Sequence, residues 1–328
     1  MNSSKKTEQF LRQYGTACMS QSLLQPMCEI YQNKKGFISY LEEHYYLGLK
    51  TPSLVLSKPI CLPEQKEDLI QEFLENHKDA SFVQVDEKMA CLLKNKFNYL
   101  IAPLGVEHQI DLQSFQYNWR LRPNLVRYKN KFQKLGFNVN EVSFNKIYVN
   151  KCMDLSKKWL KVKRHSKEQS FLTRPLLYKA EKDVRVFVLE KEEELACFLT
   201  LDPMYKHGKI IGYMINHLRY NPNLPKGAIY ALIAAIIDQL IDEKFNVLSL
   251  GLAPFNKNDQ LETDLGYMSF ILRYLYSQNT FFYNFKGLRK MKESFKATKV
   301  NSYIAFKSRW PIITCLKLYM AFLKGKNV

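Results

Sequence analysis

The sequence lacks the residue spacings that are typical of metal and redox sites. Its seven cysteines include no Cys-x-x-Cys pair, and its six histidines form neither His-x-x-x-His nor His-Glu-x-x-His. We therefore expect no metal and no cofactor. The odd, scattered set of cysteines indicates reduced thiols in a cytoplasmic setting.

Long hydrophobic runs are also missing. The N-terminal residues lack the apolar core of a signal peptide, and no apolar run approaches the length that spans a bilayer. We expect a cytoplasmic protein, with peripheral contact at the inner face of a membrane left open. The apolar tail 310–326, with Lys317 in its middle, fits either a helix on an anionic membrane or a helix docked on the core.

Acidic residues are scarce in two stretches of an otherwise balanced chain. Residues 119–167 hold 14 Lys/Arg against 2 Asp/Glu, and residues 281–328 hold 11 against 1, within a total net charge of +18. The rest of the chain is slightly acidic. Clustered cations predict an anionic partner, either nucleic acid, anionic lipid or both, whereas a surface tuned for solubility is the plain alternative.

The order of the expected elements favours an α+β fold. At 328 residues, the chain exceeds what one core usually organises. The second half is expected to run through antiparallel strands and then strand–helix–strand–helix. We expect an N-terminal domain at residues 1–147, a basic connecting helix at 148–168 and a C-terminal domain at 169–328. The looser but similar order of the first half makes an internal duplication plausible.

The stretch Phe282–Phe306 contains the most informative pattern. Its apolar residues Phe285, Leu288, Met291 and Phe295 recur at helical spacing and form one face of an amphipathic helix. The remaining surface carries five cations, which we expect to face an anion: Lys286, Arg289, Lys290, Lys292 and Lys296.

Three further segments place candidate residues at the ends of expected elements. The strand ending in Asn216, His217 and Arg219 is expected to put His217 and Arg219 on one face and Asn216 on the other. The loop before a long helix, with Gly227, could hold a phosphate at the helix start. Gly251 lies in SLGLAPF, a buried strand that stops in a loop of small residues. An Arg219 ion pair and a satisfied His217 are the structural alternatives.

Five motifs in the same order resemble the soluble catalytic domain of the phosphatidylglycerol lysyltransferases, also called multiple peptide resistance factors. YNFKGLRKMKESF, from Tyr283 to Phe295, is similar to the late motif LYxFxGLRxxKxxF of that family. SLGLAPF and SKKWL resemble two others. The segment 121–137 is similar to a helix that contains Asn124 and Lys131, and Asn216–Arg219 aligns with Asp-hydrophobic-x-Arg.

The resemblance implies two tandem acetyltransferase-like (GNAT) domains that move an amino acid from aminoacyl-tRNA to a membrane lipid such as phosphatidylglycerol. Arg219, Lys286 and Arg289 would orient phosphates and polarise the carbonyl, Asn216 and Tyr283 would donate or accept hydrogen bonds, and His217 would serve as the base. The expected substrate-binding residues are Asn124, Lys131, Lys290, Lys292, Lys296, Gly227 and Gly251.

Some positions depart from the family pattern. Asn216 stands where the family has Asp, and Ser57-Lys58-Pro59 replaces Gly-Asp-Pro. Two other interpretations therefore stay open. One is a GNAT-like acyltransferase with a different donor and acceptor, and the other is a non-catalytic protein that binds RNA or anionic membranes on the same scaffold.

Overall fold

The computed structural model of the protein describes residues 3–46, 49–118, 122–162, 168–254, 264, 285–308 and 311–323. Its α-helices are α1 (Ser3–Tyr14), α2 (Lys66–Asn76), α3 (Glu87–Phe97), α4 (Leu112–Asn118), α5 (Pro123–Lys134), α6 (Lys146–Lys161), α7 (Ala228–Asp242), α9 (Phe285–Glu293) and α10 (Ile312–Leu323). Its strands are β1 (Glu29–Gln32), β2 (Gly36–Leu41), β3 (His44–Tyr46), β4 (Leu49–Thr51), β5 (Leu54–Leu56), β6 (Ile60–Cys61), β7 (Ser81–Val85), β8 (Leu100–Asp111), β9 (Asn138–Val142), β10 (Arg185–Lys191), β11 (Glu194–Lys206), β12 (Lys209–Tyr220), β13 (Val247–Pro254) and β14 (Thr298–Phe306).

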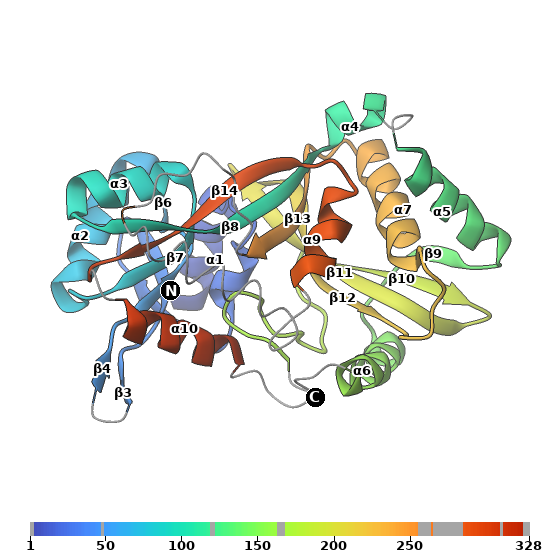
Figure 1. Cartoon of the computed structure of the whole chain (residues 1–328). Coiled ribbons are helices and arrows are strands. Elements are labelled where there is room, and N and C mark those ends of the chain that lie inside the picture. Colours follow the sequence, from blue (N-terminus) through green and yellow to red (C-terminus); the bar gives the residue numbers. More distant parts are fainter. Residues whose placement is uncertain are drawn as a thin grey trace.

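One mixed sheet runs through the molecule, in the order β1-β2-β5-β7-β14-β8-β13-β12-β11-β10-β9, with β6 on β2 (Figure 1). The strands β3 and β4 form a separate hairpin. Two neighbouring pairs in the sheet are parallel, β5 with β7 and β12 with β13. Each half of the sheet thus contains a parallel pair, as a duplicated unit would. The α+β class is confirmed, and the tandem GNAT division stays a prediction.

The two halves exchange elements along the chain. The late strand β14 inserts between β7 and β8 in the first half of the sheet. The early strand β9 pairs with β10, and the early helix α5 packs against α7, both in the second half. The domain ranges 1–147, 148–168 and 169–328 stay predictions. Strands from the first and the last of these ranges belong to the same sheet.

The alternation of side chains along β14 shows how the sheet is covered on both faces. Tyr303 and Ala305 pack with the buried residues of α2 and α3. Ile304 and Phe306 point the other way, into a core that α1 and α10 complete. This arrangement confirms the core-docked interpretation of the tail helix for one of its faces.

The second half is organised around α7, whose apolar residues occur on nearly every side. Six of them are fully buried: Leu232, Ile233, Ala234, Ile236, Ile237 and Leu240. α7 contacts α5, α4, β10 and β11, while α6 lies against β11 and β12. Among the helices of the described residues, none combines the length and apolarity that a membrane crossing requires.

Candidate functional site

The parallel strands β12 and β13 separate in the middle of the sheet. Their ladder joins residues 212–214 to residues 247–249, and the described parts of both strands form no pair beyond Met214 and Ser249. Farther along, β12 stays paired with β11, and β13 stays paired with β8. Backbone polar groups that face this opening are not used by a ladder between the two strands, so they can bind a substrate.

Lys292 of α9 reaches the backbone at this opening. Its Nζ donates a hydrogen bond to the carbonyl oxygen of Leu252 over 2.7 Å. Gly251 lies beside this contact, has a φ of 77° and belongs to a bulge of β13. A Cβ on Gly251 would lie 3.5 Å from Nζ of Lys292 and 4.0 Å from Sδ of Met214, which are ordinary contact distances. The left-handed backbone conformation, and not a lack of space, therefore favours glycine at this position.

Lys292 is buried, and burial strongly perturbs the pKa of its amine. Removal from water lowers the pKa of Lys292 to about 7, and Cys18 and Glu107 oppose this shift only in part. The prediction that Lys292 lies on the exposed cationic surface is wrong, because α9 packs on β13 and buries the face beside Met291 as well. An amine with a pKa near 7 can donate or accept a proton at neutral pH.

A pocket of about 140 Å³ adjoins the surroundings of Lys292 and shares Cys18 and Glu107 with them. Oε1 of Glu107 accepts hydrogen bonds from Ser249 at 2.7 Å and from Gln109 at 2.9 Å. Sequence reasoning missed Glu107, because the sequence pattern predicts a strand only at 99–103, whereas β8 continues to Asp111.

The wall of this pocket formed by β7 and β14 carries polar atoms without partners. Oε1 of Gln84 and Oγ of Ser302 are buried and make no hydrogen bond within the described residues. Lys58 pairs with Asp86 at 2.7 Å on the same wall. Buried polar atoms normally find partners in native proteins, so this wall is suited to a polar ligand.

Backbone strain also gathers at this wall. Ser57 and Gln84 both have a φ of 60°, in the left-handed region that L-residues rarely adopt. Ser57 stands where the resembled family has glycine, the residue for which this conformation carries no strain. Strained non-glycine residues at a pocket wall are common at ligand sites.

A second polar network lies on β11 and β12. The buried carboxylate of Asp202 accepts two hydrogen bonds from Arg174, at 2.6 and 2.8 Å, and one from Nδ2 of Asn216 at 2.9 Å. Asp202 thus supplies a carboxylate beside the position where Asn216 replaces the family's Asp. Sequence reasoning missed Arg174 and Asp202, which lie far from the motifs.

His217 belongs to the same network and is fully buried. Its Nδ1 lies 2.9 Å from Oγ1 of Thr200, and its Nε2 lies 2.8 Å from the carbonyl oxygen of Arg174. Burial, Arg219 and Arg174 hold the pKa of His217 well below its ordinary value. This geometry contradicts the base role. A bulge opposite Thr200 also breaks the strict alternation that put Asn216 on the other face.

Arg219 lies farther along β12, against α6. Its guanidinium forms an ion pair of 2.7 Å with Glu168 and sits 4.2 Å from the ring centre of Trp159. Arg219 and Glu168 are both buried. Arg219 is therefore observed in an ion pair, as the structural alternative predicted. Its catalytic role stays a prediction, and it would require this ion pair to open.

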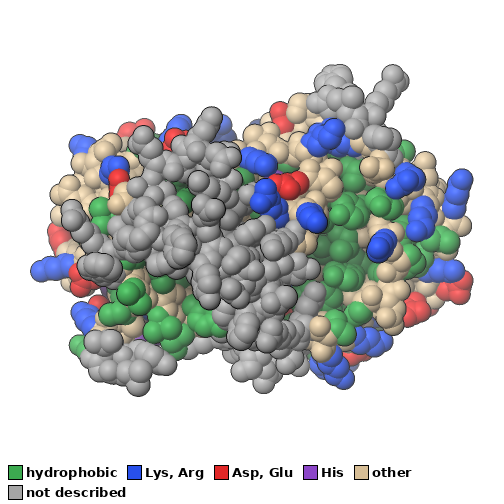
Figure 2. All heavy atoms as spheres, in the orientation of Figure 1, with side chains coloured by type: hydrophobic (Ala, Val, Ile, Leu, Met, Phe, Trp, Pro, Cys, Tyr) green, Lys and Arg blue, Asp and Glu red, His purple; other side chains and the backbone are tan. Residues whose placement is uncertain are grey.

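The cations of α9 and α5 differ in their surroundings. Arg289 is half-buried and pairs with Glu293 at 2.8 Å, while Lys290 and Lys296 are exposed. Asn124 and Lys131 are exposed on α5. Tyr283 and the side chain of Lys286 lie outside the described residues, so their predicted roles stay untested. On the face shown in Figure 2, Lys and Arg side chains border a hydrophobic area over α9, α7 and α5.

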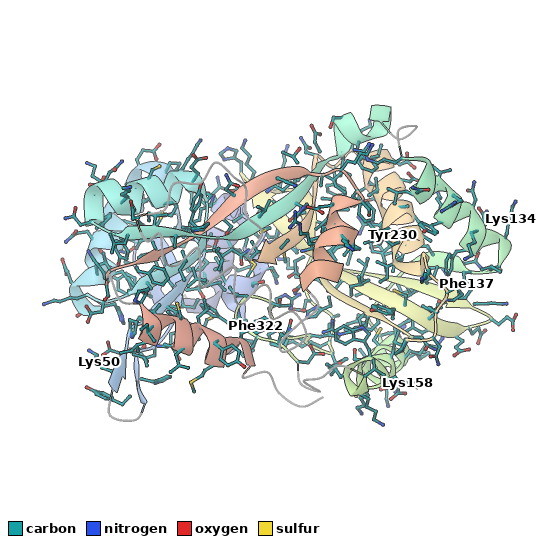
Figure 3. All side chains as sticks on the ribbon, viewed as in Figure 1. Lys50, Lys134, Phe137, Lys158, Tyr230 and Phe322 are labelled. Carbon is teal, nitrogen blue, oxygen red and sulfur yellow. The ribbon has the colours of Figure 1, made fainter. Side chains whose placement is uncertain are left out.

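The start of α7 is packed under an aromatic ring. Gly227 precedes the helix with a φ of 107°, and a Cβ there would lie 2.2 Å from the ring of Tyr128. Tyr128 stacks on Tyr230, which is labelled in Figure 3, and Tyr230 stacks in turn on Phe295, two residues after α9. These contacts explain Gly227 by packing, and phosphate binding at this helix start stays a prediction. No group of His, Cys, Asp and Glu in the described parts of the chain is arranged to hold a metal ion.

Comparisons with known proteins agree with this architecture. The chain is 26% identical over 262 residues to a phosphatidylglycerol lysyltransferase of Bacillus subtilis (strain 168), covering 77% of this chain and 30% of that protein. Its fold matches L-PGS from Bacillus licheniformis with a TM-score of 0.81 at 22% identity, over 99% of this chain and 97% of that one. The C-terminal domain of a putative lysylphosphatidylglycerol synthetase from Agrobacterium fabrum matches with a TM-score of 0.78 at 19% identity, over the same shares.

The chain thus spans about a third of the curated relative and nearly the whole of both solved structures. Residues 27–306 match the family described as "Phosphatidylglycerol lysyltransferase, C-terminal", and this match covers most of the chain. The protein therefore belongs to the family of phosphatidylglycerol lysyltransferase C-terminal domains.

Proposed function

We propose that the protein transfers an aminoacyl group from aminoacyl-tRNA to the hydroxyl group of an anionic membrane phospholipid. The observation that carries this proposal is Lys292, a buried amine with a pKa of about 7 at the opening between β12 and β13. Family membership supports aminoacyl transfer to a lipid, and the clustered cations support two polyanionic substrates, a tRNA and a lipid surface.

The reaction is a transesterification. The lipid hydroxyl oxygen attacks the carbonyl carbon of the aminoacyl ester, the bond from that carbon to the ribose oxygen breaks, and the hydroxyl proton ends on the released ribose oxygen. Lys292 can relay this proton in its neutral form or stabilise the developing oxyanion in its charged form. Because its neighbours are Leu252, Cys18 and Glu107 and not bulk water, either effect is stronger than at an exposed lysine.

The pocket beside Lys292 suits the amino group of the transferred residue. Its wall holds the carboxylates of Glu107 and Asp86 and the unpartnered Oε1 of Gln84, all of which accept hydrogen bonds. An ammonium group would bind there through charge-assisted hydrogen bonds. On the outside, the exposed Lys290, Lys296 and Lys131 would contact phosphates of tRNA or lipid without fixing the reacting atoms.

Transfer of a labelled amino acid from a mixture of charged tRNAs into extracted lipid tests this function. Lys292→Met should lower kcat/KM by about a hundredfold or more, as expected when a group that acts on the transferred proton is removed. The matched control is Lys96→Met, which removes an exposed lysine of α3, outside the two cationic stretches, and should keep transfer at the wild-type level.

Retention of transfer in Lys292→Met would contradict the assigned role of the amine. If the wild-type protein bound tRNA with a steep salt dependence but labelled no lipid from any charged tRNA, the non-catalytic binding protein would replace this proposal.

A further inference from the structure

The helix α10 exposes apolar side chains and buries its one charged side chain. Ile312, Leu316 and Tyr319 are 66%, 43% and 39% exposed. Lys317 is buried, and its Nζ donates hydrogen bonds to the carbonyl oxygens of Glu42 and Pro52. A helix that only covers a core shows the opposite pattern, with its lysine in water and its apolar residues inside. The exposed apolar face of α10 is therefore suited to contact with an apolar partner.

The hairpin of β3 and β4 lies beside α10 and exposes a further aromatic side chain. Ile312, Leu316 and Tyr319 are four and three residues apart and therefore share one helix face. α10 contacts β4, and Tyr45 of the paired strand β3 is 77% exposed. Hydrophobic side chains gather over α10 in Figure 2, and Lys50 marks the hairpin beside it in Figure 3. We name these four residues the α10–hairpin surface: Tyr45, Ile312, Leu316 and Tyr319.

The charge of the sequence that flanks α10 selects the partner. Four cations stand within five residues of the helix ends, Lys307, Arg309, Lys324 and Lys326, and no Asp or Glu follows Glu293 in the sequence. Cations alone would suit RNA, but RNA binding does not require aliphatic side chains such as Ile312 and Leu316 to face outward. Aliphatic residues for the acyl region, tyrosines for the headgroup level and the cations that flank α10 in the sequence together match an anionic bilayer.

We propose that the α10–hairpin surface docks the protein on an anionic membrane by inserting these side chains into the headgroup region. This inference rests on the proposed function, since a lipid acceptor must be reached at a membrane. Docking would hold the protein at the bilayer between successive transfers, so that a lipid is encountered by diffusion in two dimensions.

Sedimentation with vesicles of phosphatidylglycerol and phosphatidylcholine tests the docking. The variant Ile312→Gln/Leu316→Gln should lower vesicle partitioning at least tenfold, because each side chain loses favourable transfer out of water. The control is Ile147→Gln on α6, which changes an isoleucine whose exposure, 64%, is close to that of Ile312, and it should leave partitioning unchanged. Binding to vesicles of phosphatidylcholine alone should be much weaker than to the mixed vesicles.

Unchanged partitioning of the folded double variant, or equal binding to neutral vesicles, would overturn the inference. So would a change from dimer to monomer with vesicle binding retained, since a second copy would then cover the surface. Loss of RNA binding in place of vesicle binding would assign the surface to RNA.

Transfer to a dispersed short-chain phosphatidylglycerol separates this inference from the proposed function. The double variant should keep that transfer while losing transfer to vesicles. Vesicle binding without transfer to either acceptor would remove the proposed function and leave the docking intact.

Discussion

The substitution Lys292→Met should stabilise the protein at neutral pH, which is unusual for a residue placed at a site of chemistry. Burial lowers the pKa of this amine from 10.5 in the unfolded chain to about 7 in the folded protein. Between these values the unfolded chain binds the proton that the folded protein releases, so the free energy of unfolding rises with pH. At pH 7, the buried amine costs roughly 4 kcal/mol relative to an unperturbed lysine.

Methionine fills a similar volume without a charge. It leaves the carbonyl oxygen of Leu252 without its hydrogen bond from Nζ, at a cost of about 1 kcal/mol. We therefore expect a net gain of about 3 kcal/mol in the free energy of unfolding at pH 7. At pH 10 the unfolded lysine is itself partly neutral, the burial cost falls to about 1 kcal/mol, and the gain should vanish.

Urea unfolding at pH 7, 8.5 and 10, followed by tryptophan fluorescence, measures this difference. The control is Lys290→Met on the same helix, where an exposed ammonium is removed and the effect should be small and equal at all three values. If Lys292→Met is less stable than the wild type at pH 7, or if its advantage is the same at pH 7 and pH 10, the buried-amine reasoning is refuted. A variant that is more stable and inactive would assign the loss of transfer to chemistry and not to unfolding.

Two other substitutions test the packing around the site. Arg219→Ala should lower the free energy of unfolding by about 3–5 kcal/mol, because it leaves Glu168 buried without its partner. In thermal melts, the double variant Arg219→Met/Glu168→Leu should recover most of that loss. Equal stability of Arg219→Ala and the wild type would show that the ion pair is not buried in solution. Gly227→Ala should cost about 2 kcal/mol more than Gly208→Ala, since both place alanine at a positive φ but only position 227 meets the ring of Tyr128; equal losses in urea unfolding would contradict the close contact.

Periodicity predicted most elements of the fold. The apolar run 36–41 predicts a strand with the observed bounds of β2, and the long apolar pattern 227–243 predicts a helix that differs from α7 by one residue at each end. Both segments carry strong local signals. The sequence also predicts a helix at 261–277, which apart from Asp264 lies outside the described residues. For β8 the sequence predicts a strand at 99–103 only, whereas the strand continues to Asp111 between β13 and β14.

The site was less predictable than the fold, for a physical reason. Motifs are local in sequence, whereas the surroundings of Lys292 combine Cys18, Glu107 and Leu252 from three distant segments. A charged residue on an amphipathic helix is normally exposed, so the pattern alone put Lys292 in water. Only the packing of α9 against β13 reverses that expectation. Gly251 was predicted to bind substrate because it lies where a buried strand stops in a loop of small residues, and that role stays a prediction.

Asn216 stands where the family has Asp, and its side chain lies beside another carboxylate, that of Asp202. The neighbouring Asp202 is buried, and two hydrogen bonds from Arg174 hold its charge. An Asp at 216 would place a second carboxylate against Asp202, and like charges at that distance disfavour joint ionisation. Asn216 donates to Asp202 instead, so one carboxylate, one guanidinium and one amide satisfy each other. The substitution thus removes a charge from β12, and Nδ2 of Asn216 still finds a partner in Asp202.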